Sequence, residues 1–112
     1  MAKVEISERL KQEIFKKFKG ESVKVLDLLY SLKENPKKGK ELGQVSGILV
    51  KELKYKNFRF YFIVSSYGIR FYDLEKLNEL VIKIVRMSDK KSQQKTIDEI
   101  KHILRRLGSH GF

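Results

Sequence analysis

The first third of the chain carries apolar residues at the spacing typical of helices. Alternation over residues 4–6 predicts a short strand, and Ser7 is a suitable N-cap for the helix that follows. The apolar stripe of this helix is Leu10, Ile14 and Phe18. A second helix is predicted from about Ser22 until Asn35-Pro36, with Val25, Leu26, Leu29 and Leu32 along one side. Because Gly20 is a helix stop between them, the two helices are expected to form a hairpin.

After residue 48 the period of the pattern changes to two, which is typical of strands. Strands are predicted over residues 48–55, 58–65, 69–73 and 80–86, and the long connection before them is placed at residues 36–40. A last helix is predicted to begin at Thr96, where Glu99 completes a capping box. Its apolar stripe is Ile97, Ile100, Ile103, Leu104 and Leu107.

This order of elements predicts an α+β fold with a small antiparallel β-sheet, an N-terminal helical hairpin packed on one face and a C-terminal helix. Residues 1–112 are expected to form a single domain. Along the strand 58–65, Phe58, Phe60 and Phe62 share one face and are expected to meet the helices. The opposite face is then expected to be open, and it carries Glu52, Lys54, Arg59 and Tyr61.

Charge adds a class of partner to this picture. The chain has 25 Lys and Arg against 14 Asp and Glu, a formal net charge of +11. Such a surplus favours a polyanionic partner, with nucleic acid ahead of an acidic protein and of an anionic membrane. The arrangement of the basic residues must decide among these partners, because Lys-rich proteins are also basic for reasons unrelated to binding.

Several classes of chemistry are excluded or disfavoured by composition. The chain has no cysteine, which excludes disulfides, thiolate catalysis and Cys-type zinc sites. Its two histidines, His102 and His110, lack metal-ligand spacing, so neither a metal nor another cofactor is expected. No apolar run approaches the length of a membrane span or of a signal peptide, so we expect a cytoplasmic protein without a membrane partner.

Three short motifs, in this order, are similar to a known family. They are Glu52-Leu53-Lys54, Phe58-Arg59-Phe60-Tyr61 and Lys90-Lys91-Ser92-Gln93. With the sequence around them, roughly residues 40–107, they resemble the RelE/HigB toxins of bacterial and archaeal toxin-antitoxin systems. The resemblance implies a small RelE-like ribonuclease that cuts mRNA on the ribosome without a metal, inhibits translation and is silenced by an acidic cognate antitoxin.

The resemblance also implies roles for individual residues. Arg59 takes the place of the strand arginine that binds the scissile phosphate, and Lys54 that of a basic residue on the neighbouring strand. The implied catalytic set is Lys54, Arg59, Arg86, Glu52 and Tyr61, and the implied RNA-binding set is Lys51, Lys56, Lys90, Lys91 and Lys95. The sequence departs from the family in having Lys54 where arginine is frequent, no aromatic residue near Ser88 and no proline after Thr96.

The chemistry of metal-free RNA cleavage fits these residue types. The ribose 2′-hydroxyl attacks phosphorus, so a site must accept one proton, donate another and stabilise the extra negative charge. Arginine forks suit the last task. Either Lys54 or Glu52 is a candidate base, and Tyr61 or Tyr55 is a candidate proton donor or stacking platform.

Other interpretations remain open at this stage. Arg59 is alternatively an ordinary exposed cation paired with Glu52, and the whole face a non-catalytic RNA- or ribosome-binding surface. A gyrase-directed ParE-like toxin or an inactive relative would keep the fold and lose the RNA chemistry. Convergence of Lys54, Arg59 and Arg86 would favour the enzyme, whereas a spread basic stripe would favour simple binding.

Overall fold

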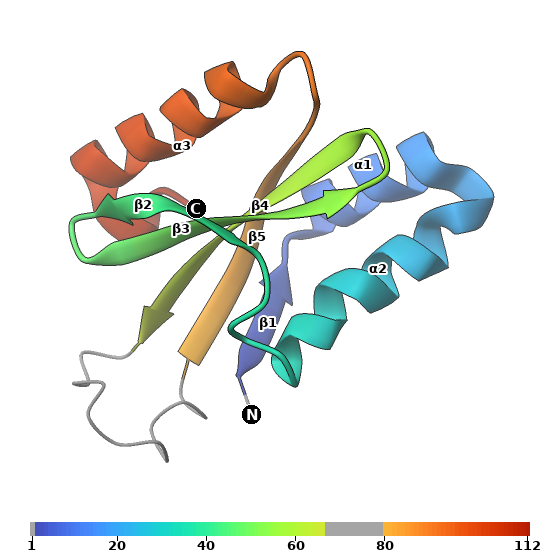
Figure 1. Cartoon of the computed structure of the whole chain (residues 1–112), viewed down its shortest axis with the longest axis horizontal. Helices are drawn as coiled ribbons and strands as arrows, with labels where there is room; N and C mark the ends of the chain where they lie inside the picture. The colour runs from blue at the N-terminus through green and yellow to red at the C-terminus, as the bar shows by residue number, and fades with distance from the viewer. Residues whose placement is uncertain (1, 67–79) are drawn as a thin grey trace.

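The computed structural model describes residues 2–66 and 80–112, which form an α+β fold with a central sheet (Figure 1). The helices are α1 (Glu8–Phe18), α2 (Ser22–Tyr30) and α3 (Gln93–Leu107), and short 3-10 turns are η1 (Lys19–Glu21), η2 (Ser31–Lys33) and η4 (Gly108–Gly111). The strands are β1 (Lys3–Ile6), β2 (Lys40–Val45), β3 (Ile48–Tyr55), β4 (Phe58–Ser66) and β5 (Leu80–Asp89). They form a five-stranded sheet in the order β1-β5-β4-β3-β2, in which β1 is parallel to β5 and the other pairs are antiparallel.

The N-terminal helical segment begins as the sequence predicts and continues differently. The Ser7 side chain caps α1 by accepting a hydrogen bond from the Leu10 N–H at 3.2 Å, and the predicted apolar stripe is buried. The hairpin with a stop at Gly20 is not found as such. The backbone turns instead at Lys19, which has φ +47°, and η1 leads directly into α2. Helical structure therefore runs almost without interruption from residue 8 to residue 33.

The first face of the sheet packs against α1 and α2, as predicted. Phe60 and Phe62 are fully buried there with Leu53, in contact with the apolar stripes of the two helices. Each buried side chain of this size stabilises the fold by roughly 1.5–3 kcal/mol relative to leaving it exposed. This face forms the larger of the two apolar clusters.

The second face is not open, which corrects the prediction from strand parity. Helix α3 lies across it, on the side of the sheet away from α1 and α2 (Figure 1). Its residues Ile97, Ile100 and Leu104 pack against apolar strand residues such as Val50 and Ile63. These strand residues continue the same face beyond Glu52 and Tyr61, so the face has too much apolar surface to remain in water. The sheet is therefore covered on both sides.

Two further elements differ from the predictions. Strand β2 was not expected, and it pairs with β3 through a turn at Ser46 and Gly47, both with positive φ. Helix α3 begins at Gln93 rather than at Thr96, whose hydroxyl donates a hydrogen bond to the Ser92 carbonyl inside the first turn. The predicted strand over 69–73 lies outside the described residues. Within the part of the chain that the structure describes, no helix is long and apolar enough to cross a membrane.

Gly39 lies where a side chain would not fit, which gives a test of the packing between residues 36–40 and the sheet. It has φ +106°, and an added Cβ would lie 2.8 Å from Cζ of Phe62 and 3.0 Å from the Glu52 carbonyl oxygen. We expect Gly39→Ala to lower the free energy of unfolding by about 1–3 kcal/mol, measured by urea denaturation.

The matched control is Gly20→Ala, since nothing lies within 4 Å of an added Cβ there. It should change the free energy of unfolding by less than about 0.5 kcal/mol. Equal denaturation midpoints for the two variants would contradict the described position of Gly39.

Candidate nucleic-acid interface

The catalytic candidates from the sequence lie together on three adjacent strands. Cross-strand pairing forms one row of Lys54 on β3, Arg59 on β4 and Ser88 on β5. The next row consists of Glu52, Tyr61 and Arg86 on the same strands. Residues directly opposite each other in a sheet point to the same face, so the two rows form one block on the side that α3 covers. The prediction that Glu52, Lys54, Arg59 and Tyr61 share a face is confirmed.

Arg86 joins this block because β5 contains a bulge. Tyr61 pairs with Arg86 and Phe62 with Ile84, so Val85 is an extra residue in β5. A bulge of this kind interrupts the alternation of side chains. Val85 consequently packs in the cluster under α3, and the neighbouring Arg86 also turns to α3, where its Nε lies 3.2 Å from Oε1 of Glu99.

Glu52 and Arg59 form a buried ion pair, whereas an exposed position was predicted for Arg59. The Arg59 Nε lies 3.0 Å from Oε1 of Glu52, and their side chains are only 10% and 7% exposed. The Arg59 guanidinium also donates to the Phe58 carbonyl at 3.2 Å. From the first turn of α3, Gln93 donates to both carboxylate oxygens of Glu52 at 3.3 Å. The interpretation of Arg59 as the ion-pair partner of Glu52 is confirmed, but the pair is enclosed.

Tyr61 is completely buried beside this pair. Its hydroxyl lies 2.8 Å from Oγ of Ser88, and that serine donates its own hydrogen to the Asp89 carbonyl at 2.9 Å. Tyr61 is therefore the donor to Ser88. Burial is the main cause that raises the pKa of Tyr61, and the Glu52 charge adds to it, while the hydrogen bond that Ser88 can donate to the phenolate form acts in the opposite direction. Tyr61 thus keeps its proton at neutral pH.

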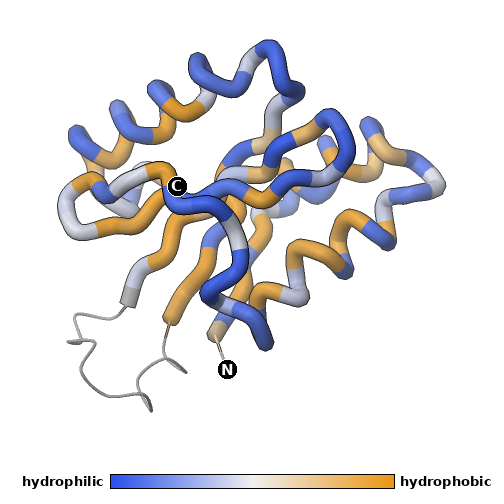
Figure 2. Tube along the Cα trace, viewed as in Figure 1, coloured by the Kyte–Doolittle hydropathy of each residue, from blue (hydrophilic) through white to orange (hydrophobic). Residues whose placement is uncertain are grey.

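The exposed lysines among the predicted site residues lie at one end of the sheet. Lys54 lies near the end of β3, Lys56 lies in the β3–β4 turn, and Lys90, Lys91 and Lys95 lie in or just after the connection from β5 to α3. Figure 2 shows hydrophilic residues at this turn and at the start of α3. Lys56 pairs with Glu21, but among residues 2–66 and 80–112 no carboxylate lies within ion-pair distance of the other four lysines. This end of the molecule, which we call the lysine end, offers ammonium groups to a polyanion.

Lys51 lies apart from the lysine end. It is on the α1–α2 side of the sheet and only 6% exposed, and its Nζ donates to the Lys37 carbonyl at 2.9 Å. Burial lowers the pKa of Lys51, and the charge of Glu41 offsets part of that effect. The sheet separates it from Lys54, so the structure does not bring Lys51 together with the other predicted RNA-binding lysines.

The polar block contains two residues that sequence reasoning did not select. Gln93 was noted only as part of a motif, and Ser88 only as a departure from the family. Strand parity was the signal for Ser88, because it lies two positions from Arg86 on β5 and past the bulge. No pattern in the sequence pointed to Gln93, because its contact with Glu52 depends on the residue at which α3 begins.

No cluster of three or more potential metal-ligating side chains occurs within the described ranges. No protein-family model, curated protein or solved structure matches this chain.

The buried ion pair predicts a large difference between two neighbouring cations. Arg59→Ala is expected to lower the free energy of unfolding by about 3 kcal/mol, because it leaves the buried Glu52 carboxylate without its partner. Lys54→Ala, at the exposed position directly opposite, should change it by less than about 0.5 kcal/mol. Urea denaturation of both variants provides the measurement, and similar midpoints would show that Arg59 does not lie in a buried pair.

Proposed function

We propose that this protein is a toxin of the RelE/HigB kind, a metal-independent endoribonuclease that cleaves mRNA on the ribosome in the cytoplasm. The observation that carries the proposal is the block of Lys54, Arg59, Glu52 and Tyr61 immediately beside the lysine end. A single-stranded RNA held by the lysines would pass next to groups able to bind its phosphate and move protons.

The order of the elements supports a RelE-like architecture. A first strand is followed by two helices on one face, then by a largely antiparallel sheet and a terminal helix. In the proposed architecture α1 and α2 are the two arms of the helical hairpin, and the short η1 turn is the connection between them. The three motifs of the resemblance fall on β3, β4 and the start of α3, which the fold places side by side.

Four residues of the block have a proposed role in the reaction. Lys54 faces solvent and contacts the substrate, either as an ammonium group on the phosphate or, in its neutral amine form, as the base that accepts the 2′-hydroxyl proton. The Arg59 fork stabilises the negative charge of the transition state, and Glu52 positions it. Tyr61, which holds its proton, donates to the leaving oxygen.

Access to Arg59 and Tyr61 requires the first turn of α3 to move. The two hydrogen bonds from Gln93 to Glu52 are long, at 3.3 Å, and they are the polar contacts that join this turn to the ion pair. RNA that binds the neighbouring Lys90, Lys91 and Lys95 would draw the same segment outward. In the closed arrangement the phosphate-binding arginine is occupied by Glu52.

The burial of Arg59 favours a second candidate function, a non-catalytic RNA- or ribosome-binding module. In that case the exposed lysines bind the phosphates, and the Glu52–Arg59 pair serves only the fold. Both candidate functions require an RNA partner, but only the nuclease cleaves that RNA.

An acidic antitoxin is the proposed protein partner. The net charge of +11 favours association with a negatively charged chain, and the lysine end is the surface such a chain would cover. Covering it would exclude RNA without any change in the buried block.

Cleavage distinguishes the two candidates. Lys54→Ala should reduce the rate of mRNA cleavage by on the order of 100-fold, because an exposed charge next to Arg59 is lost while the fold is kept. The readout is primer extension on a reporter message translated in a cell-free system. Lys33→Ala is the control, since Lys33 is also exposed and follows α2 near the N-terminus. If Lys54→Ala still produced the new transcript ends at an unchanged rate, the catalytic role of Lys54 would be contradicted. If the unmodified protein produced no new transcript ends, the non-catalytic binding module would be favoured.

Salt dependence tests the lysine end independently of cleavage. Each phosphate contact with single-stranded RNA contributes about 0.7 to the slope of log K against log salt. Replacing Lys90, Lys91 and Lys95 together by glutamine should therefore reduce the slope by up to about 2, measured by fluorescence anisotropy with a labelled single-stranded RNA. The same change at Lys33, Lys37 and Lys38 removes equal charge elsewhere and should leave the slope nearly unchanged. Equal reductions in both triple variants would mean that net charge alone governs binding.

A further inference from the structure

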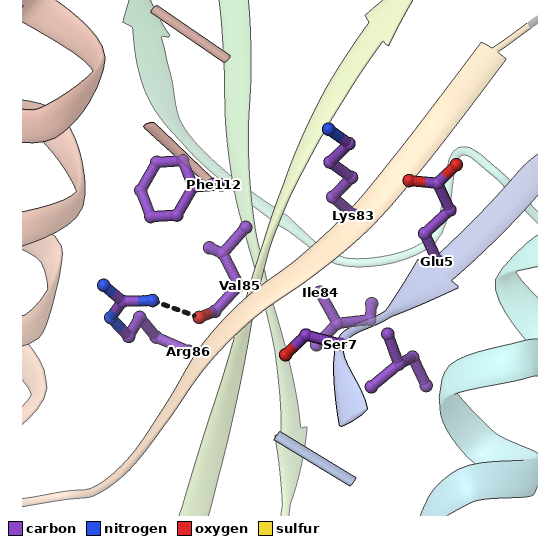
Figure 3. Close-up of a pocket in the computed structure, with 8 residues that line it drawn as sticks. Glu5, Ser7, Lys83, Ile84, Val85, Arg86 and Phe112 are labelled. Atoms are coloured by element: carbon purple, nitrogen blue, oxygen red, sulfur yellow. Dashed lines mark hydrogen bonds between the residues drawn. The ribbon is translucent and has the colours of Figure 1, made fainter. Parts of the chain in front are cut away.

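A pocket lies over β1 and β5, on the same side of the sheet as α3. Its volume is about 260 Å³. Figure 3 shows Arg86 and Phe112 at one side of it, Glu5 at the other, and Lys83 and Ser7 at its two ends. Ile6, Ile84 and Val85 complete its lining. The pocket is separate from the lysine end, and Arg86 links it to the Tyr61 row.

The β5 bulge forms the cationic side of this pocket. Lys83, Val85 and Arg86 would not all face one way in a regular strand, but the extra residue turns Arg86 to the side that Lys83 and Val85 already face. Arg86 is held there by Glu99, by the Val85 carbonyl at 2.7 Å and by the Phe112 ring, whose centroid lies 5.2 Å from the guanidinium carbon. The guanidinium and the aromatic ring are therefore fixed as a unit.

Glu5 on the opposite side and Lys83 at one end of the pocket carry a carboxylate and an ammonium group that do not neutralise each other. Glu5 and Lys83 are register partners on β1 and β5, but Glu5 pairs with Lys3 at 3.2 Å. Within residues 2–66 and 80–112, no carboxylate lies within ion-pair distance of Lys83. The pocket thus presents a cation available to an anion, together with a carboxylate able to accept hydrogen bonds from hydroxyl groups.

We propose that this pocket binds one ribonucleotide unit. Lys83 and Arg86 bind its phosphate, the Phe112 ring contacts its base, and Glu5 accepts hydrogen bonds from ribose hydroxyls. The volume lies below the roughly 300–1,000 Å³ of sites for drug-sized ligands, which matches one unit rather than a longer segment. An acidic peptide fits less well, because its carboxylates would lie close to the carboxylate of Glu5 and, when bound to Arg86, close to that of Glu99.

This inference rests on the proposed function in one respect, since it takes the unit to belong to an RNA strand. A second hollow of about 160 Å³ adjoins the first at Ser7 and Arg86, and it is lined by Ser7, Arg9, Leu10, Glu13, Arg86 and Glu99. Arg86 also lies directly opposite Tyr61. A strand bound at the lysine end therefore reaches the pocket by passing over Arg86, and the pocket holds a nucleotide that flanks the cleaved bond.

Two probes distinguish a strand from a free nucleotide. Adenosine 5′-monophosphate represents the free unit, and an RNA hexamer that keeps its 2′-hydroxyls represents a strand, which stays intact in this titration because the proposed cleavage takes place on the ribosome. Titration of each probe, followed by NMR, should shift the amide signals of Ser7, Val85, Arg86 and Phe112. Lys83→Gln should weaken binding of the responding probe about tenfold, as expected for loss of one charge-assisted phosphate contact. Lys33→Gln, at an exposed distant site, should leave it unchanged.

The outcomes separate this inference from the proposed function. Shifts at the four amides with the hexamer alone place an RNA strand in the pocket, and shifts with the monophosphate as well make it a general nucleotide site. Inorganic phosphate that binds as tightly as the monophosphate would overturn the assignment to a nucleotide. Hexamer binding without these shifts, and unaffected by Lys83→Gln, would overturn the pocket even if mRNA is cleaved. Conversely, pocket binding in a protein that never cleaves mRNA would overturn the nuclease and leave the nucleotide site.

Discussion

The ion pair between Glu52 and Arg59 determines how the sheet and the C-terminal helix fit together. Removing two charges from water costs several kcal/mol for each ion, and good geometry with further hydrogen bonds is needed to offset it. The pair meets this requirement through the 3.0 Å contact, the Phe58 carbonyl and the amide of Gln93. Gln93 belongs to α3, so the first turn of that helix is part of the polar environment of the sheet. The polar cover of the site depends on this interaction, while the apolar contacts of Ile97, Ile100 and Leu104 hold the rest of α3 on the sheet.

Arginine and lysine are used differently in this molecule. Arg59 and Arg86 each pair with a glutamate on the covered side of the sheet, where a planar guanidinium can make several directed hydrogen bonds. Lys54, Lys90, Lys91 and Lys95 are exposed around the rim, and an ammonium group on a flexible stem suits contact with a polyanion of variable shape. The arginines thus organise the site, while the lysines supply its electrostatic attraction.

Strand parity predicted much of the candidate site, because side-chain alternation depends only on local geometry. It placed Phe60 and Phe62 on one face and Glu52, Lys54, Arg59 and Tyr61 on the other. It did not predict the cover of that second face, because the apolar Val50 and Ile63 were given no weight beside the polar residues. Strand β2 was missed because its sequence contains Gly43 and charged residues, and pairing with β3 forms it despite that composition. The bulge at Val85 and the reach of Gln93 depend on contacts between distant segments, which no local pattern records.

The parallel pairing of β1 with β5 has a consequence for the order in which the chain folds. Lys3 pairs with Val81, so the first strand has no partner until most of the chain exists. Contacts between such distant segments require a long loop to close and form late. The two cross-strand rows that contain Ser88 and Arg86 likewise form only after β5 has been synthesised. Glu52 is covered only after α3 has been synthesised. During synthesis, the groups proposed to act on RNA therefore come together only as the last quarter of the chain emerges.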